Sequence, residues 1–289
     1  MDLVSNRVLI FGENSFTGEY LSSYLYSKGY SIFGTDRKSC DITNKDNIKK
    51  TLREINPNYI INLSGIASPA HGDVLEFYRV NTIGAINIIE ALIELDLNPK
   101  KIVLVSSATI YGNQGLEVLD ESLFPQPANY YGTSKYSMEL MAKNYFNRLN
   151  IIITRPFNYT GVKQSENFLI PKIVNHFREK KETIELGNLD VSREFNDISF
   201  VCEVYKRLLE SSIKSEVINI CSGRGIKLVD VIDTMNFIAG YNIKVEVNPA
   251  FIRKDEIKSL LGSPKKLFSL INEVKQKEFK ETLKDMFEV

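Results

Sequence analysis

Short apolar runs rich in β-branched residues alternate with segments of helical spacing along the first half of the chain. Each run is apolar at most consecutive positions, as in strands that helices cover on both faces of a parallel sheet. The clearest runs are Arg7–Phe11, Tyr30–Gly34, Tyr59–Leu63, Lys101–Val105 and Ile151–Thr154. This alternation predicts an α/β fold in which successive β-α-β units form a doubly wound parallel sheet.

The pattern changes after about residue 156, where longer polar stretches containing Pro171 and Gly187 follow. No further clean unit appears before the strand-like Val217–Ile220. We predict a sheet domain over residues 1–160, rejoined by about 195–222, and a smaller C-terminal lobe in the remainder of 161–289 that covers the carboxyl ends of the strands. The last stretch, Glu273–Val289, has the spacing of an amphipathic closing helix.

Charge, hydropathy and cysteine spacing exclude several classes of protein. The chain holds 36 Lys and Arg against 36 Asp and Glu, whereas nucleic-acid-binding proteins carry clustered positive charge. No apolar run approaches the roughly 18 to 20 residues that cross a bilayer, and the first residues lack the order of a signal peptide. Cys40, Cys202 and Cys221 are too widely spaced for a disulfide framework or a clustered metal site. We expect a cytoplasmic protein with no metal and no nucleic-acid or membrane partner.

A glycine-punctuated turn follows the first predicted strand. The sequence Gly12-Glu13-Asn14-Ser15-Phe16-Thr17-Gly18 fits G-x-x-G-x-x-G with a serine in place of the middle glycine. In Rossmann-like folds these glycines permit a tight turn and close helix–strand packing, so that N–H groups of the helix face a pyrophosphate. We predict a dinucleotide site contacted by Gly12, Ser15, Phe16 and Gly18. A purely structural turn is the alternative.

The second predicted strand ends in Thr35-Asp36-Arg37, where such folds place the residue that reads the adenosine ribose. Asp36 would bind the ribose hydroxyls and select NAD(H), whereas Arg37 would pair with a 2′-phosphate and select NADP(H). We favour NADP(H) and keep NAD(H) open, along with a solvated turn that has neither role. Asp41 is expected either to cap the next helix or to contact adenine.

The residues suited to chemistry follow the fourth predicted strand and begin a later helix. Ser107 lies within Ser106–Gly112, and Tyr131 and Lys135 lie four residues apart on one helix face. The lysine ammonium is therefore expected to lower the phenol pKa from about 10 toward working pH. Ser107 would hold a substrate oxygen beside the phenol, so that proton transfer and hydride transfer act on one carbon.

These motifs together resemble the extended short-chain dehydrogenase/reductases that act on nucleotide sugars, and within them the GDP-6-deoxy-mannose reductases, also called GDP-4-keto-6-deoxy-mannose reductases. The matching stretches are Gly12–Leu21, Ser106–Gly112, Tyr130–Lys135, Arg155–Asn158, Asp190–Asp197, Asn219–Gly223 and Asn248–Arg253. The first three indicate the superfamily, and the later ones favour the sugar-reductase branch. The chain departs from the pattern at Ser15 and in having no tryptophan.

The resemblance implies a catalytic triad of Ser107, Tyr131 and Lys135, with Tyr131 and Lys135 also contacting the cofactor. It also implies substrate contacts in the C-terminal lobe and near the active site, at Asn81, Asn158, Arg193, Arg253 and Glu256. Asn158 and Arg193 would lie at the nucleotide diphosphate, and Arg253 and Glu256 near the base. An arginine suits a diphosphate because its planar fork donates two hydrogen bonds, although a surface ion pair is the alternative for both arginines.

The reaction that the resemblance implies is NAD(P)H-dependent reduction of the C4 keto group of a nucleotide-linked 4-keto-6-deoxy sugar, with a GDP-linked sugar favoured. A 4,6-dehydratase is disfavoured because Ala108 and Thr109 occupy the positions of its acidic residues. A coupled 3,5-epimerase-reductase is disfavoured because no cysteine lies near Ser107. We expect His71 and His176 to be structural. A 4-epimerase with the same triad and a non-catalytic NAD(P)-binding protein stay open. The resemblance also implies a homodimer that pairs the helices around 74–95 and 131–149.

Overall fold

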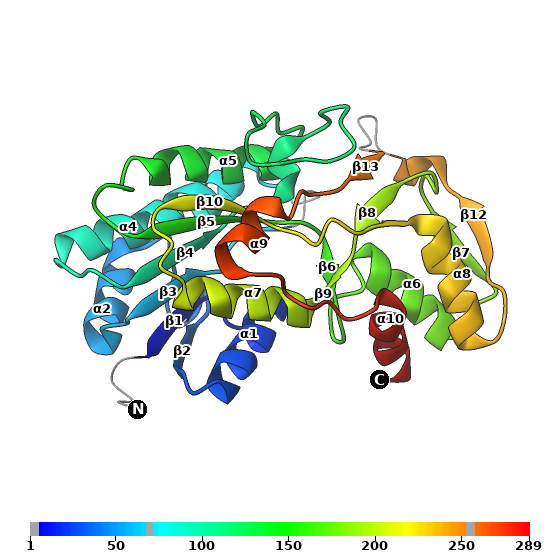
Figure 1. The fold of residues 1–289 in the computed structure, drawn as a ribbon, viewed down its shortest axis with the longest axis horizontal. Helices are drawn as coiled ribbons and strands as arrows, with labels where there is room; N and C mark the ends of the chain where they lie inside the picture. The colour runs from blue at the N-terminus through cyan, green and yellow to red at the C-terminus, as the bar shows by residue number, and fades with distance from the viewer. Residues whose placement is uncertain (1–5, 68–71, 253–257) are drawn as a thin grey trace.

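A six-stranded sheet, parallel throughout, forms the centre of the larger lobe in the computed structural model, which describes residues 6–67, 72–252 and 258–289 (Figure 1). The strand order is β10-β5-β4-β3-β1-β2. The strands are β1 (Arg7–Phe11), β2 (Ser31–Thr35), β3 (Tyr59–Asn62), β4 (Lys101–Val105), β5 (Ile151–Pro156) and β10 (Glu216–Ile220). The predicted doubly wound α/β fold is confirmed. The strand order reverses between β1 and β3, and ligands of such sheets bind at the carboxyl ends of the strands at this point.

Helices cover both faces of the sheet. One layer contains α1 (Phe16–Ser27), α7 (Ile198–Glu210) and α9 (Lys265–Ile271), and the other contains α2 (Lys45–Ile55), α4 (Ala85–Glu94) and α5 (Tyr130–Lys143). Val8 and Ile10 of β1 pack in the first layer, whereas Leu9 and Phe11 pack in the second. Successive side chains of a strand point to opposite faces, so both sets are buried. This explains why the strand sequences show apolar runs instead of alternation.

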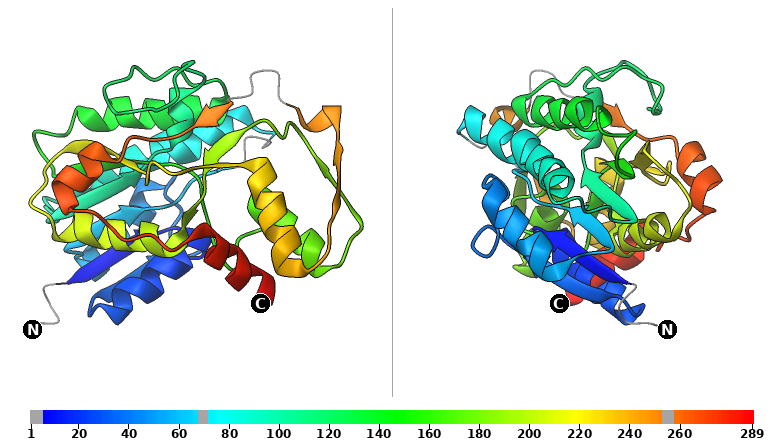
Figure 2. Two further views of the ribbon diagram at one scale, coloured as in Figure 1. Left: turned by 45° about the vertical axis from the view of Figure 1, so that its right-hand side comes forward. Right: turned by 90° about the vertical axis from the view of Figure 1, so that its left-hand side faces the viewer.

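The smaller lobe lies at the carboxyl ends of the strands (Figures 1 and 2). Its core combines the apolar faces of α6 (Leu169–Arg178), α8 (Leu228–Ala239) and α10 (Phe279–Glu288). Its short strands are β6 (Tyr159–Thr160), β7 (Thr183–Leu186), β8 (Ser192–Glu194), β9 (Asn196–Asp197), β11 (Gly225–Lys227), β12 (Lys244–Val247) and β13 (Ser259–Leu260). The predicted closing helix occurs as α10, which buries Leu283 and Met286 but begins at Phe279, six residues after the predicted start at Glu273.

The chain returns to the sheet more than once. Helix α7 and strand β10 lie within the predicted rejoining range of 195–222 and pack with the sheet. Helix α9 also returns, through Leu267 and Ile271, which the sequence pattern did not indicate. The division of the chain at residue 160 stays a prediction.

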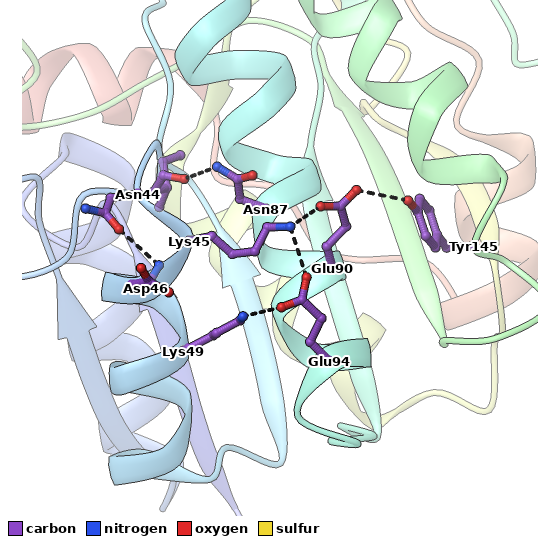
Figure 3. Close-up of polar contacts among 9 residues, drawn as sticks. Asn44, Lys45, Asp46, Lys49, Asn87, Glu90, Glu94 and Tyr145 are labelled. Atoms are coloured by element: carbon purple, nitrogen blue, oxygen red, sulfur yellow. Dashed lines mark hydrogen bonds and ion pairs between the residues drawn. The ribbon is translucent and has the colours of Figure 1, made fainter.

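Polar contacts fasten the helices of the second layer to one another (Figure 3). Lys45 of α2 pairs with Glu90 and Glu94 of α4, and Lys49 pairs with Glu94. These side chains are partly exposed, and such pairs contribute about 1 kcal/mol or less each. Most of the stability of this layer therefore comes from the buried apolar side chains beneath the pairs, such as Ile48 and Leu52.

Two further features bear on the sequence-based expectations. Within the described ranges, every helix is too short or too polar to cross a membrane. Cys40, Cys202 and Cys221 are buried free thiols. Burial raises the pKa of the Cys202 thiol to about 12, so it is an unreactive thiol at neutral pH.

Candidate active site

The turn between β1 and α1 is built from two glycines and a serine cap. Gly12 has φ of +82°, and a Cβ atom there would lie 2.8 Å from the main-chain nitrogen of Ser64. A Cβ atom on Gly18 would lie 2.5 Å from the carbonyl oxygen of Gly12. Ser15 is the N-cap of α1, with its Oγ accepting from the Gly18 N–H at 3.1 Å. Ser15 has an ordinary extended backbone, so a serine replaces the expected glycine without strain.

The same turn fits the pyrophosphate of a dinucleotide. The N–H groups of Phe16 and Thr17 belong to the first turn of α1, where no helical carbonyl can accept from them. They face the end of the sheet where the strand order reverses, and the positive end of the helix dipole favours an anion there. Because backbone approaches backbone at Gly12 and Gly18, larger residues at these two positions would close the turn.

Asp36 organises the turn that follows β2. Its Oδ1 accepts from the main-chain N–H groups of Lys38 and Ser39, at 3.0 and 2.8 Å, and from the Ser39 hydroxyl at 2.9 Å. Its Oδ2 accepts from the side-chain amide of Asn14 at 2.8 Å, which joins this turn to the glycine turn. The hydrogen bonds from Ser39 keep the pKa of the Asp36 carboxyl below its ordinary value. Asp36 therefore stays ionised beside the expected adenosine site.

Arg37 is held by a carboxylate that it shares with a second arginine. Glu76 of α3 (Val74–Phe77) pairs with Arg37 at 3.2 Å and with Arg79 at 3.0 Å. The Arg37 and Arg79 side chains are 76% and 58% exposed, so much of each guanidinium faces solvent. These two arginines and Glu76 leave one positive charge in excess, which the ionised Asp36 beside Arg37 opposes.

The expectation that Asp41 caps the next helix is wrong. Asn44 is the N-cap of α2, and its side chain accepts from the N–H groups of Asp46 and Asn47. The carboxylate of Asp41 accepts instead from the N–H and the hydroxyl of Thr43, at 2.9 and 2.8 Å. This local turn ends two residues before the first residue of the helix, which explains the error. The contact of Asp41 with adenine stays a prediction.

Ser107 and Tyr131 meet at the carboxyl end of β4. Ser107 is the N-cap of the 3₁₀ helix η3 (Ala108–Tyr111), and a side-chain hydrogen bond joins it to Tyr131 of α5. Close packing of the two elements depends on Gly132, where a Cβ atom would lie 3.1 Å from the Thr109 carbonyl oxygen. The structure thus brings together two residues that the sequence separates by the loop between η3 and α5.

Lys135 lies one helical turn after Tyr131 and is buried. Its ammonium donates to the Val105 carbonyl oxygen at 2.8 Å, and a Cβ atom on Gly65 would lie 3.0 Å from its Nζ. Burial lowers the pKa of Lys135 to about 8, opposed by the charge of Glu139. All three members of the predicted triad therefore gather at the ends of β3 and β4.

The expected lowering of the Tyr131 pKa by Lys135 does not occur in this structure. Burial raises the pKa of Tyr131 to about 12, while the hydrogen bond from Ser107 lowers it. The effect of burial is the larger of the two. The Lys135 ammonium is directed to the Val105 carbonyl. The phenol is therefore protonated at neutral pH, as a proton donor must be.

Asn81 fixes the loop after β3 against the catalytic helix. It lies in the π-helix η2 (Tyr78–Gly84), a form that is frequent at functional sites. Its side-chain amide bonds the main-chain N–H and carbonyl of Ile66, at 2.8 and 3.2 Å, and donates to the Ser134 hydroxyl at 3.0 Å. Ser134 in turn donates to the Tyr131 carbonyl at 2.8 Å. Asn81 thereby orients the helical turn between Tyr131 and Lys135.

A buried ion pair supports the site from behind. Arg155 of β5 donates from Nε and Nη2 to the two carboxylate oxygens of Glu139 on α5, at 3.0 and 2.7 Å, and from Nη1 to the Tyr111 hydroxyl at 2.8 Å. The sequence did not indicate a role for the Arg155–Glu139 pair. Two signals were present, an arginine in an apolar strand and a glutamate four residues after Lys135. These two signals do not show that Arg155 and Glu139 form an ion pair with each other.

The predicted substrate residues are only partly described. The Asn158 carbonyl accepts from the Asn196 N–H at 3.0 Å, which places Asn158 beside the segment that carries Arg193. Arg193 lies in β8 and donates from Nη1 to the carbonyls of Ser192 and Lys258, at 2.8 and 3.0 Å.

The predicted substrate residues Arg253 and Glu256 lie outside the described ranges, as does His71, for which we expected a structural role. His176 lies on α6, and its Nδ1 bonds the Lys172 carbonyl at 2.8 Å. A bond within its own helix agrees with the structural role that we expected for His176.

Residues 8–221 match the NAD dependent epimerase/dehydratase family. A GDP-6-deoxy-D-talose 4-dehydrogenase from Aggregatibacter actinomycetemcomitans is 33% identical, with 97% of each chain covered. A GDP-6-deoxy-D-mannose reductase from Pseudomonas aeruginosa is 26% identical, with 91% of this chain and 90% of the relative covered.

Two solved structures share the fold over nearly the whole chain. A Burkholderia cenocepacia J2315 protein, provisionally called an epimerase, has a TM-score of 0.92 and 38% identity, with 98% of this chain and 97% of that chain covered. RMD from Pseudomonas aeruginosa, complexed with NADPH, has a TM-score of 0.89 and 24% identity, with 99% and 97% covered. The match over residues 8–221 and the 33% identity to a relative of nearly equal extent confirm the predicted resemblance. The chain belongs to the NAD dependent epimerase/dehydratase family, whose members are enzymes.

Proposed function

We propose that this enzyme reduces the C4 keto group of a nucleotide-linked 4-keto-6-deoxy sugar with NAD(P)H, and that the sugar is GDP-linked. The observation that carries the proposal is the convergence of Tyr131, Ser107 and Lys135 at the sheet end where the strand order reverses. Two relatives named for GDP-6-deoxy sugars support the substrate class.

The side chains divide the work of reduction. A bound reduced nicotinamide supplies the hydride to C4. Tyr131 donates its proton to the C4 oxygen, and Ser107 donates a hydrogen bond to the same oxygen. The ammonium of Lys135, one helical turn away, stabilises the phenolate that Tyr131 becomes. Asn81 positions the turn of α5 that lies between Tyr131 and Lys135.

The names of the two relatives indicate which ketone is reduced, but they do not indicate which of two products forms. 6-Deoxy-talose and 6-deoxy-mannose differ only in configuration at C4, so oxidation of either at C4 gives the same 4-keto sugar. The product depends on which face of the sugar is turned toward the cofactor. We propose that Asn158, Arg193, Arg253 and Glu256 set this orientation by binding the nucleotide diphosphate and base.

A 4-epimerase is the second candidate, favoured by the provisional name of the Burkholderia protein at 38% identity. It would use the same phenol, hydroxyl and lysine, but the cofactor would be regenerated in each cycle. A 4,6-dehydratase has less support, because no carboxylate occurs in η3 directly after Ser107. A protein that binds the cofactor without catalysis is disfavoured by the assembled triad.

We propose NADPH as the cofactor, because Arg37 and Arg79 converge on Glu76 at the end of β2. Guanidinium groups that are held in place and still largely exposed suit a 2′-phosphate. Asp36 is already engaged by Asn14 and the Ser39 turn, which leaves less of its carboxylate for a ribose diol. Residues Gly12, Ser15, Phe16 and Gly18 would hold the pyrophosphate.

We also propose a homodimer formed through the helices of the second layer. Leu75, Ile83, Leu140 and Met141 on α3, η2 and α5 are exposed apolar side chains. A second copy of the chain would cover these side chains. Size-exclusion chromatography with light scattering should therefore give the mass of a dimer. A cytoplasmic location stays a prediction.

The proposed reaction is tested by product analysis. The enzyme is incubated with 4-deuterated NADPH, carrying the label on either face, and with GDP-, dTDP- and CDP-linked 4-keto-6-deoxy-hexoses. We expect stoichiometric NADPH oxidation with the GDP-linked ketone, and deuterium at C4 of a single 6-deoxy-hexose. A parallel incubation contains the corresponding 4-hydroxy sugars in place of the ketones, and their interconversion without net change in nicotinamide absorbance would instead identify the 4-epimerase. Absence of turnover with all ketosugars would contradict the proposal.

A further inference from the structure

The hydroxyl oxygen of Ser107 accepts two hydrogen bonds, both from Thr109. Its Oγ accepts from the main-chain N–H of Thr109 at 3.2 Å and from the Thr109 hydroxyl at 2.8 Å. A serine hydroxyl has two acceptor lone pairs and one proton. Thr109 thus uses both acceptor positions of Ser107, and the Ser107 proton is left to be donated.

The direction of that donation matters for the proposed reaction, on which this inference rests. A ketone oxygen only accepts hydrogen bonds, so a serine that presented a lone pair to it would repel the substrate. We propose that Thr109 is a positioning residue, whose hydroxyl fixes Ser107 as a hydrogen-bond donor, toward Tyr131 before the substrate binds and toward the substrate carbonyl oxygen afterwards. Nothing in the triad pattern itself specifies this orientation, because a hydroxyl rotor turns to suit its partners.

The backbone places Thr109 where it can act on both catalytic residues. Its side chain bonds Ser107, while its carbonyl packs against Gly132, the residue after Tyr131. Ser107 has extended backbone angles, with φ of −162° and ψ of 148°, and its carbonyl accepts from the Ile110 N–H at 3.3 Å. The Ser107–Thr109 geometry is therefore fixed by the turn before any substrate binds. This fits preorganisation of a donor that meets the charge developing on the C4 oxygen.

The inference extends the role of η3 beyond that of a connector. With Thr109 in place, the C4 oxygen faces two donors, the phenol of Tyr131 and the hydroxyl of Ser107, one for each lone pair. Without the threonine hydroxyl, Ser107 keeps only the bond from the Thr109 N–H and is able to turn its proton elsewhere. The expected loss is in kcat rather than KM, because the donor strengthens its bond as the oxygen gains charge.

The test compares Thr109→Val and Thr109→Ser by steady-state reduction of the GDP-linked ketosugar. Valine keeps the shape and the main-chain N–H and removes the hydroxyl. We expect kcat to fall about 5- to 20-fold in Thr109→Val with KM within about twofold, and Thr109→Ser to restore most of the rate. Thr133→Val is the matched control, since the Thr133 hydroxyl donates to the Asn129 carbonyl at 2.9 Å and does not contact Ser107. An unrescued Thr109→Ser would overturn the inference.

A double-mutant cycle separates positioning from direct substrate contact. In a Ser107→Ala background, Thr109→Val should change kcat by less than about twofold, because the hydroxyl it orients is gone. Equal effects of Thr109→Val with and without Ser107 would refute the positioning role.

A second measurement does not depend on turnover, so it also decides the matter if the proposed reaction fails. Neutron diffraction of the cofactor-bound enzyme locates the hydroxyl deuterium atoms. We expect the Thr109 deuterium on the line to Ser107 Oγ and the Ser107 deuterium directed toward Tyr131. A Ser107 deuterium that points at Thr109 Oγ1 would overturn the inference, whatever the substrate is.

Discussion

The ammonium of Lys135 donates a hydrogen bond to the main-chain carbonyl of Val105 at 2.8 Å. Val105 is the last residue of β4, and Ser107 follows two residues later. This bond ties the helix that carries the phenol to the strand that presents the serine hydroxyl. The relative position of Ser107 and Tyr131 therefore depends on a side chain that must itself be charged for catalysis.

The rate of ketone reduction should fall as pH rises through about 8. Burial lowers the pKa of Lys135 to about 8, so the amine loses its charge in that range, whereas burial raises the pKa of Tyr131 to about 12 and keeps the phenol protonated. We expect kcat/KM to be level near neutral pH and to fall about tenfold per pH unit well above 8. A pH–rate profile measures this decrease. The Lys135→Arg variant stays charged, so the activity that it retains should not decrease above pH 8. A wild-type profile that is level to about pH 10 would refute the assignment.

Gly132→Ala should slow catalysis. The added Cβ atom would lie 3.0 Å from Pro127 Cβ and 3.1 Å from the Thr109 carbonyl oxygen, so α5 must shift from η3. A displacement of a few tenths of an ångström between Ser107 and Tyr131 is expected to lower kcat about 10-fold. Gly72→Ala is the control, because its Cβ atom would meet nothing within 4 Å. The idea fails if both variants retain the wild-type kcat.

Glu139→Ala should destabilise the fold strongly. Glu139 and Arg155 are buried, and removal of the carboxylate leaves an uncompensated guanidinium. We expect the free energy of unfolding to drop by about 3–5 kcal/mol, measured by denaturant titration. Glu246→Ala removes one partner of the exposed Lys244–Glu246 pair and should cost less than about 1 kcal/mol. If the free energy of unfolding fell by similar amounts in the two variants, the buried pair would contribute no more to stability than the exposed pair.

Arg37→Ala should change the cofactor preference. Loss of the guanidinium removes donors to a 2′-phosphate, so KM for NADPH is expected to rise about 10-fold or more, while KM for NADH changes little. Arg178→Ala, on α6 of the smaller lobe, removes the same charge from an exposed side chain and should alter neither constant. Equal changes of both constants in Arg37→Ala would exclude the phosphate contact.

The parts of the fold that depend on local pattern could be predicted from the sequence. The run at Arg7–Phe11 is apolar at all its buried positions, and the run at Lys101–Val105 is apolar at all its buried positions except Lys101. The glycine turn and the Tyr131–Lys135 pair are encoded within a few neighbouring residues. Ser15 agrees with the pattern for a physical reason, because the position serves as a helix N-cap with ordinary backbone angles.

What the sequence did not show depends on contacts between distant residues. The direction of the Tyr131 pKa shift follows from the burial of the phenol, which depends on residues distant in the sequence. The Arg155–Glu139 pair needs the packing of β5 on α5. Asp41 was misplaced because a local turn at Thr43 precedes the true cap by one residue.

The central claim is that Tyr131 gives its proton to the C4 oxygen, and single-turnover oxidation of enzyme-bound NADPH by the GDP-linked ketosugar tests it most directly. Tyr131→Phe keeps the ring and removes the proton, so the rate constant should fall at least about 100-fold while the Kd for NADPH stays within about twofold. A phenylalanine variant that oxidised NADPH at a rate close to that of the wild type would contradict the proposed role of Tyr131.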